Sequence, residues 1–392
     1  GIEASHTVRE YSDIKKFLKD DIQAYTQFFE TRFLLGDKKI YDEWVEKVKA
    51  SLDKKNRDRL FNVYFEDNKL RHEKYGRSPK VLEPNIKYSN GGLRDLHAAE
   101  WIYCVINNVM LTDQRENTQT ECFLEYISNQ NIISKREAKR VLQSFKILQA
   151  ARNNLHLLSK RKNDRLEFLF QDKIAHLLEY GGDAWSSFMH DYFEASGNIS
   201  RFYRSMVKKY YEQITRPIAD EMGIKLDEDF ILKGDIISHS SDKPLSISDI
   251  MRAFYYRGKY DARFSEPLRS VILLMTEDQK DEMLPESESS VFFREILKLE
   301  KCVARTLFAM NELQVLGLFI PEFKDMVGFF QPGVYHCYTA DEHTLIAIKN
   351  LEKLNGDESK LGLLFGELEE KDLLYMSVLM HDIAKPISVS GH

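Results

Sequence analysis

The sequence predicts a mainly α-helical protein, with multi-helix bundle domains and one small β-hairpin insertion. Its 392 residues are enough for two or three domains with substantial cores. Only 9 prolines and 18 glycines are present, which leaves few turn signals for a many-stranded β architecture. Apolar residues instead recur at helical spacing along most of the chain. We expect three domains, at residues 1–210, 211–333 and 334–392.

Each segment with helical apolar spacing is expected to form one helix. These segments are 14–35, 40–52, 96–109, 135–158, 164–180, 185–214, 247–256, 267–275, 288–299, 302–316 and 373–383. The polar stretch 71–80 is expected to be a loop. Short apolar runs around Asp229 and Gly234, within residues 223–241, predict the β-hairpin.

Composition excludes several classes of function. The formal net charge of −6 gives no indication of binding to nucleic acid or to an acidic membrane surface. The longest apolar runs are far shorter than the ~18 residues that span a bilayer. The four cysteines are scattered without close pairs, which argues against disulfides and zinc–thiolate sites and fits the cytoplasm.

A metal site is indicated near the C-terminal end, where Ser377, His381 and Asp382 are the strongly polar members of the apolar run 373–383. A helix that is apolar on every face is normally buried, and burying imidazole beside carboxylate without partners costs several kcal/mol. A divalent cation would relieve that cost, because both groups are good ligands. Two ordinary core histidines are the alternative. Pro386 is expected to end this helix.

A second histidine is expected on another helix. Thr339 is a plausible N-cap, and Glu342, three residues later, would complete a capping box. His343 then falls in the first turn or just beyond it, where the helix dipole favours the neutral, metal-binding imidazole.

A glycine motif is the most unusual local pattern of the chain. It consists of residues 83–87 (EPNIK) followed by residues 91–95 (GGLRD). Gly91 and Gly92 at the start of a helix would let the backbone approach a phosphate, with Lys87 and Arg94 adding positive charge. The alternative is a tight turn that only fixes the start of the helix.

This motif closely resembles a signature of the bacterial PII uridylyltransferase/uridylyl-removing enzymes. Further strings resemble that family in the same order along the whole chain, and their order carries the resemblance. They are residues 5–9 (SHTVR), 30–37 (ETRFLLGD), 319–323 (FIPEF) and 335–345 (YHCYTADEHTL).

The order of His343, the string 381–385 (HDIAK) and His392 also looks like the opening of an HD-type phosphohydrolase domain. The resemblance implies metal ligands and a divalent metal, Mg²⁺ or Mn²⁺. The implied ligands are His343, His381, Asp382 and His392, the last as a ligand or a phosphate contact. It implies catalytic roles for His381, Asp382 and Lys385, where Lys385 would contact a phosphate; Lys385 could equally be a solvated lysine at a helix end.

The resemblance implies a bifunctional enzyme. Such an enzyme transfers UMP from UTP to the regulatory protein PII, and its HD domain removes that UMP by hydrolysis. Glutamine would act only through domains that this chain lacks, and the transferase phosphate loop and metal-binding acids would precede Gly1. We therefore expect a central fragment that does not transfer UMP alone. Lys87, Gly91, Gly92 and Arg94 would bind the nucleotide or form the scaffold of the transferase cleft.

Two other functions fit the same sequence. One is a related enzyme that acts on a different protein or a free nucleotide, which a PII-binding assay would distinguish. The other is a non-catalytic interaction module, against which the intact His343, His381 and Asp382 argue.

Overall fold

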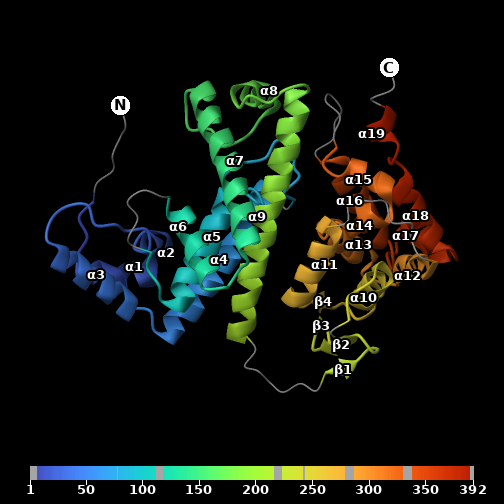
Figure 1. Cartoon of the computed structure of the whole chain (residues 1–392), viewed down its shortest axis with the longest axis horizontal. Coiled ribbons are helices and arrows are strands. Elements are labelled where there is room, and N and C mark those ends of the chain that lie inside the picture. Colours follow the sequence, from blue (N-terminus) through green and yellow to red (C-terminus); the bar gives the residue numbers. More distant parts are fainter. Residues whose placement is uncertain are drawn as a thin grey trace. The chain divides into compact units, whose positions relative to one another are not determined.

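The computed structural model describes residues 7–76, 78–111, 118–215, 223–241, 243–278, 287–329 and 338–388. Helices dominate, so the predicted mainly α fold is confirmed (Figure 1). The chain divides into two compact units, Gly1–Pro217 and Ile218–His392. Among the described residues, no helix is both long enough and apolar enough to cross a membrane.

The secondary-structure elements in the described part of the first unit are helices, apart from an isolated β-bridge between Asn85 and Arg165. Its helices are α1 (Tyr11–Asp20), α2 (Ile22–Thr26), α3 (Lys38–Ala50), α4 (Lys54–Tyr75), α5 (Leu93–Asn107), α6 (Gln119–Asn129), α7 (Lys135–Ser159), α8 (Phe168–Leu177) and α9 (Ala184–Thr215). Helix α5 packs between α4 and α9, and α9 also packs along α7 and α8. Leu96, Ala99 and Ile102 of α5 are fully buried, so α5 is the central helix of this unit.

Two expectations for the first unit are wrong. The single helix expected over 14–35 is broken at Asp21, whose side chain accepts a hydrogen bond from the Ala24 amide and starts α2. Asp commonly competes with the helix in this way. The loop expected over 71–80 is helical up to Tyr75, and α4 ends at Gly76, which has a φ of +121°. The division between the two compact units falls at residue 217, close to the domain boundary expected at 210.

The second unit contains a small sheet and the remaining helices. Its elements are β1 (Ile224–Lys225), β2 (Phe230–Lys233), β3 (Ile236–His239), α10 (Ile247–Lys259), β4 (Arg263–Phe264), α11 (Glu266–Asp278), α12 (Ser287–Leu297), α13 (Val303–Glu312), α14 (Val315–Phe319), α15 (Pro321–Met326), α16 (Ala340–Glu352), α17 (Lys360–Glu367), α18 (Lys371–Met380) and α19 (Lys385–Ser388). The predicted hairpin is β2–β3, which pair in antiparallel register around Gly234. Strand β1 adds to β2, and β4 lies parallel to β3.

One hydrophobic cluster runs through the second unit from the sheet to α18. It includes Phe230, Phe254, Phe264, Leu307, Met310, Phe323, Leu345, Ile348, Tyr375 and Leu379. Leu345 and Ile348 of α16 thus pack in the same core as Tyr375 and Leu379 of α18. The helix expected over 302–316 is interrupted at Gln314, which has a φ of +61° and separates α13 from α14.

Candidate functional site

The packing of α16 against α18 brings His343 and His381 together. His343 lies in the first turn of α16, as expected, and its amide donates to the Thr339 carbonyl at 2.8 Å. His381 is the C-cap of α18. Leu345 and Leu379, two residues from each histidine, are fully buried in the shared core. The two imidazoles therefore sit on helices whose relative position is fixed by apolar packing.

His343, His381 and Asp382 form a three-residue cluster of possible metal ligands. One ligand atom from each lies within 4.8 Å of the other two, and the two imidazole centroids are 5.9 Å apart. His381 Nδ1 is 2.6 Å from the Val378 carbonyl oxygen, so Nδ1 carries the proton and donates it. The Nε2 lone pair of a neutral His381 is then free to bind a metal, and Nε2 lies 3.2 Å from Asp382 Oδ2.

The surroundings of this cluster differ from the expectation that the helix is buried all round. Leu373 is 50% exposed, and Ser377 and His381 are exposed one and two turns farther along the same face of α18. Because that face meets solvent, burial alone does not require a metal. Asp382, at 8% exposure, is buried. The approach of His343 to His381 and Asp382 is the stronger indication of a cation site.

The chain after His381 also differs from expectation. Helix α18 ends at Met380, and Pro386 lies inside α19 instead of ending the preceding helix. The intervening turn is held by amide-to-carbonyl bonds from Ile383 to Met380 and from Lys385 to Asp382. Pro386 is tolerated because it sits in the first turn of α19, where its missing N–H has no helical partner. Lys385 Nζ donates to Asp382 Oδ2 at 2.7 Å. His392 lies outside the described residues.

The start of α16 is capped differently from the predicted capping box. Thr339 is the N-cap residue, but its side chain makes no capping bond to the helix backbone. Its hydroxyl donates instead to Asp341 Oδ1 at 2.7 Å. The predicted capping box is therefore absent, and the Thr339 hydroxyl is bonded to the buried Asp341 instead.

The donor set suits a divalent cation. Two imidazole nitrogens and a carboxylate oxygen are ligands that Mn²⁺, Fe²⁺ and Zn²⁺ accept, and Mg²⁺ accepts the oxygen more readily than the nitrogens. The accessible face of His381 gives solvent and substrate a route to the cluster. The residues present therefore fit a divalent-metal centre that solvent can reach.

The glycine motif is tightly packed in the first unit. Gly91 has a φ of +75°, and a Cβ on it would lie 2.1 Å from the Ser196 carbonyl oxygen of α9. A Cβ on Gly92 would lie 2.8 Å from the Ile86 carbonyl oxygen. Only glycine fits both positions, because any side chain would displace backbone atoms. The two glycines thus allow the motif to pack against α9 and to start α5.

The amides of the motif already have partners. The Gly91 amide donates to Asp95 Oδ2 at 2.7 Å. The next three amides donate to backbone carbonyls: Gly92 to Ser89 at 2.8 Å, Leu93 to Ile86 at 3.0 Å and Arg94 to Lys87 at 2.9 Å. In this arrangement the start of α5 offers none of these N–H groups to a phosphate. A nucleotide phosphate would have to contact side chains.

The side chains of Lys87 and Arg94 both lie near the Tyr88 ring. Lys87 Nζ is 4.9 Å from the Tyr88 ring centroid, and the Arg94 guanidinium carbon is 5.9 Å from it and 4.9 Å from the Trp101 ring centroid. Burial raises the pKa of Tyr88, but hydrogen bonds and charges from Lys87 and Arg94 outweigh it and lower that pKa. This half-buried tyrosine therefore lies in a locally positive environment.

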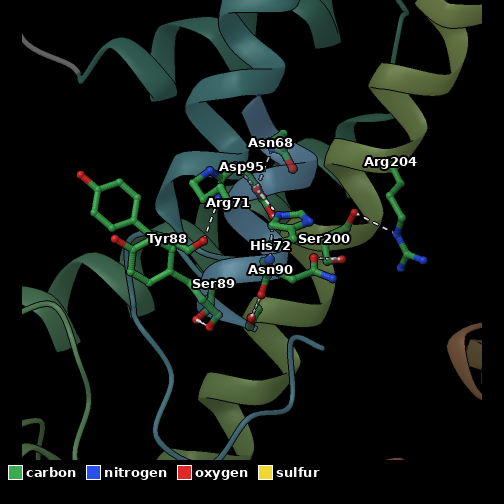
Figure 2. A network of polar contacts seen from close by, with 12 residues as sticks. Asn68, Arg71, His72, Tyr88, Ser89, Asn90, Asp95, Ser200 and Arg204 are labelled. Carbon is green, nitrogen blue, oxygen red and sulfur yellow. Dashed lines mark hydrogen bonds and ion pairs between the residues drawn. The ribbon is translucent and has the colours of Figure 1, made fainter. Parts of the chain in front are cut away.

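A buried polar network anchors the motif to α4 (Figure 2). Asp95 is fully buried, and its carboxylate accepts from Arg71 at 2.6 Å and from Asn68 at 3.0 Å, with His72 Nε2 at 2.8 Å. Burial raises the pKa of Asp95, but hydrogen bonds and charges from His72 and Arg71 outweigh it and hold that pKa low. The sequence carried a signal for this network, since the three partners are spaced i, i+3 and i+4 on one face of α4.

Fold and site together define a mainly helical protein with a candidate divalent-metal centre. Residues 59–207 match the family model described as GlnD PII-uridylyltransferase. The chain is 30% identical over 401 residues to a bifunctional uridylyltransferase/uridylyl-removing enzyme of Haemophilus influenzae (strain 86-028NP), covering 98% of the chain and 44% of that enzyme. It is also 29% identical over 404 residues to a Pasteurella multocida enzyme of the same name, and the match again covers 98% of the chain and 44% of that enzyme.

The chain is similar over nearly all of its length to bacterial enzymes named bifunctional uridylyltransferase/uridylyl-removing enzyme, so the resemblance predicted from its motifs is confirmed. It spans less than half the length of these curated relatives. No solved structure shows significant similarity to the chain.

Proposed function

We propose that this chain belongs to a bifunctional enzyme that attaches UMP from UTP to the protein PII and removes it again by hydrolysis. Similarity to enzymes named for both activities, over 98% of the chain, supports the proposal. The observation that carries it is the cluster of His343, His381 and Asp382, with ligand atoms within 4.8 Å of one another. Such a centre would serve the hydrolytic half of the enzyme.

For the removing activity, we assign residues 334–392 to an HD domain. His343, His381 and Asp382 would hold Mg²⁺ or Mn²⁺, with His392 as a further ligand or a phosphate contact. When bound, the ion would polarise the phosphodiester and lower the pKa of a water. The Val378 carbonyl keeps the proton on His381 Nδ1, and thereby directs Nε2 to the ion.

Lys385 is assigned a second role in the removing activity. Its ammonium bonds Asp382 Oδ2 at 2.7 Å and so lies beside the ligand cluster, where it would contact a phosphate oxygen of the substrate. That contact would offset the negative charge that develops on the phosphate during hydrolysis.

For the transferring activity, we assign Gly91 and Gly92 to the scaffold of the cleft, because the space around both is filled by backbone atoms. Lys87 and Arg94 are then the candidates for nucleotide contacts, because their side chains carry positive charge near the half-buried Tyr88. Glutamine control would come from parts of the intact enzyme outside this chain. The scattered cysteines favour a cytoplasmic enzyme.

Replacing His381 by alanine is expected to abolish metal-dependent release of UMP while sparing UMP transfer. The measurement is the release of UMP from uridylylated PII, with Mn²⁺ or Mg²⁺, by an intact enzyme that contains this chain. Loss of one of three ligands should lower the rate by at least about 100-fold.

Ser377→Ala is the matched control, because Ser377 is exposed one helical turn before His381 and its hydroxyl donates to the Leu373 carbonyl of its own helix. It should release UMP at the wild-type rate. Equal release by the His381→Ala enzyme would contradict the assigned centre. Failure of the wild-type enzyme to act on uridylylated PII would favour a different protein or nucleotide as substrate.

A further inference from the structure

We propose that Asp341 is the positioning residue that holds His343 in place opposite His381 and Asp382, so that a divalent ion can bind all three. This inference rests on the metal centre assigned under the proposed function. Asp341 is fully buried, two residues before His343, in the first turn of α16. It is not itself a member of the ligand cluster among the described residues.

The Asp341 carboxylate joins three separate parts of the second unit. Oδ1 accepts from the Gly328 amide at 3.1 Å and from the Thr339 hydroxyl at 2.7 Å. Oδ2 accepts from Asn311 Nδ2 on α13 at 2.9 Å. The start of α16 is thereby tied to α13, to the residues that follow α15 and to its own N-cap.

These bonds add polar anchors to the first turn of α16. The fully buried hydrophobic residues of α16, Leu345 and Ile348, lie after His343. Before His343, among the described residues of α16, only the partly buried Ala340 packs against the core, and the first turn has no N-cap side-chain bond. First turns fray easily when their caps are lost, because four amides lack helical partners there. Fraying would move the His343 imidazole, because the direction of a helical side chain is set by the regular rise of ~1.5 Å and rotation of ~100° per residue, and a frayed turn loses that regularity. Ligand atoms that now lie within 4.8 Å of one another would then separate.

The role depends on hydrogen-bond geometry, so a neutral isostere should preserve it. In Asp341→Asn, the amide oxygen can accept from Gly328 and Thr339 while its NH₂ faces Asn311. The Asn311 side-chain amide can flip to present its oxygen, since both of its orientations have the same shape. Asp341→Ala removes every one of these bonds and leaves the Gly328 amide and Asn311 without them.

The test is Mn²⁺ binding to the full chain, followed by electron paramagnetic resonance. Wild-type protein should bind Mn²⁺ and show nitrogen couplings from two imidazoles. Asp341→Ala should bind at least about tenfold more weakly, the scale of loss seen when partners of metal ligands are removed. The Mn²⁺ that still binds to this variant should show the nitrogen coupling of one imidazole, that of His381. Asp341→Asn should retain both couplings and an affinity within about threefold of wild type.

Further variants keep the test decisive. Lys349→Ala, an exposed change in the last turn of α16, should bind Mn²⁺ like wild type. If Asp341→Ala does not fold, Asn311→Ala serves instead and should weaken binding while leaving the carboxylate in place.

The possible outcomes separate the two proposals. Two imidazole couplings and wild-type affinity in Asp341→Ala, or in Asn311→Ala, would overturn the positioning role. So would a loss in Asp341→Asn equal to that in Asp341→Ala, because the charge would then matter instead of the geometry. Absence of Mn²⁺ binding by the wild-type chain would instead count against the metal centre.

Discussion

Replacing Asp95 by asparagine is expected to lower the free energy of unfolding of the first unit by about 3–5 kcal/mol. The side chain of Arg71 is only 8% exposed and its Nη2 lies 2.6 Å from Asp95 Oδ1, so the variant leaves a buried cation without its counter-charge. The Gly91 amide also loses its carboxylate acceptor. Removing one partner of a buried ion pair lowers the free energy of unfolding more than replacing both partners with apolar residues does.

Urea unfolding followed by tryptophan fluorescence measures this effect selectively, because Trp44, Trp101 and Trp185 all lie in the first unit. The double variant Arg71→Met with Asp95→Asn should recover at least about 1–2 kcal/mol relative to the sum of the single losses. Asp172→Asn, at a 63% exposed side chain, should change the unfolding free energy by less than about 0.5 kcal/mol. A loss of that small size in Asp95→Asn would show that the network does not anchor α5.

The contribution of Asp95 also has a defined pH dependence. The folded pKa is lower than the ordinary value of 3.8, so the unfolded chain binds the proton more tightly. The stabilisation is therefore present above the unfolded pKa and is lost as the pH falls towards the folded pKa. Asp95→Asn should show a correspondingly weaker acid dependence.

Glu100 is expected to destabilise the first unit increasingly as the pH rises, and Glu100→Gln should remove that dependence. Glu100 is 2% exposed on α5, and its Oε1 has no hydrogen-bond partner in the described part of the chain. Burial raises its pKa from 4.5 to about 8; the charge of Glu30 adds to this effect, and the nearby Gln119 side chain opposes it. The folded protein thus retains a proton that the unfolded chain has already lost.

The direction in which pH changes the free energy of unfolding follows from this difference in bound protons. Between pH 4.5 and about 8 the folded state binds more protons than the unfolded state, so stability falls as the pH rises through that window. Each pKa unit corresponds to about 1.4 kcal/mol. The advantage of Glu100→Gln over wild type should therefore be about 2–4 kcal/mol larger near pH 8.5 than near pH 5.

The same fluorescence-detected unfolding tests this prediction at several pH values. Glu125→Gln on α6 is the control, because Glu125 is exposed, and it should follow the wild-type curve. Parallel curves for Glu100→Gln and wild type would mean that the carboxyl group is not held protonated in the folded state.

The helical character of the chain and the position of His343 in the first turn of α16 were predictable from sequence because both are local. Apolar spacing marks helices such as α7 and α9, and the Thr339 N-cap places His343 in its first turn. The strings that carry the family resemblance are likewise contiguous. The hairpin was predictable from its short apolar runs around Gly234.

The features that sequence did not reveal depend on contacts between distant residues. The partners of Asp95 lie 23 to 27 positions earlier in the chain, and their helical spacing shows that they share a face but not that Asp95 packs against that face. The role of Asp341 needs Asn311, 30 positions earlier. Helix ends were also missed where one residue decides them, as at Asp21 and Gly76, because side-chain caps and positive φ values override apolar spacing.

The metal centre is tested most directly by anomalous X-ray diffraction from crystals of the chain grown with Mn²⁺. The expected result is an anomalous peak within coordination distance, ~2.1–2.3 Å, of His343, His381 and Asp382. It should disappear in His381→Ala crystals grown in the same way. A peak elsewhere in the chain, or no peak with these three side chains well ordered, would contradict the assignment of a metal-dependent hydrolytic site.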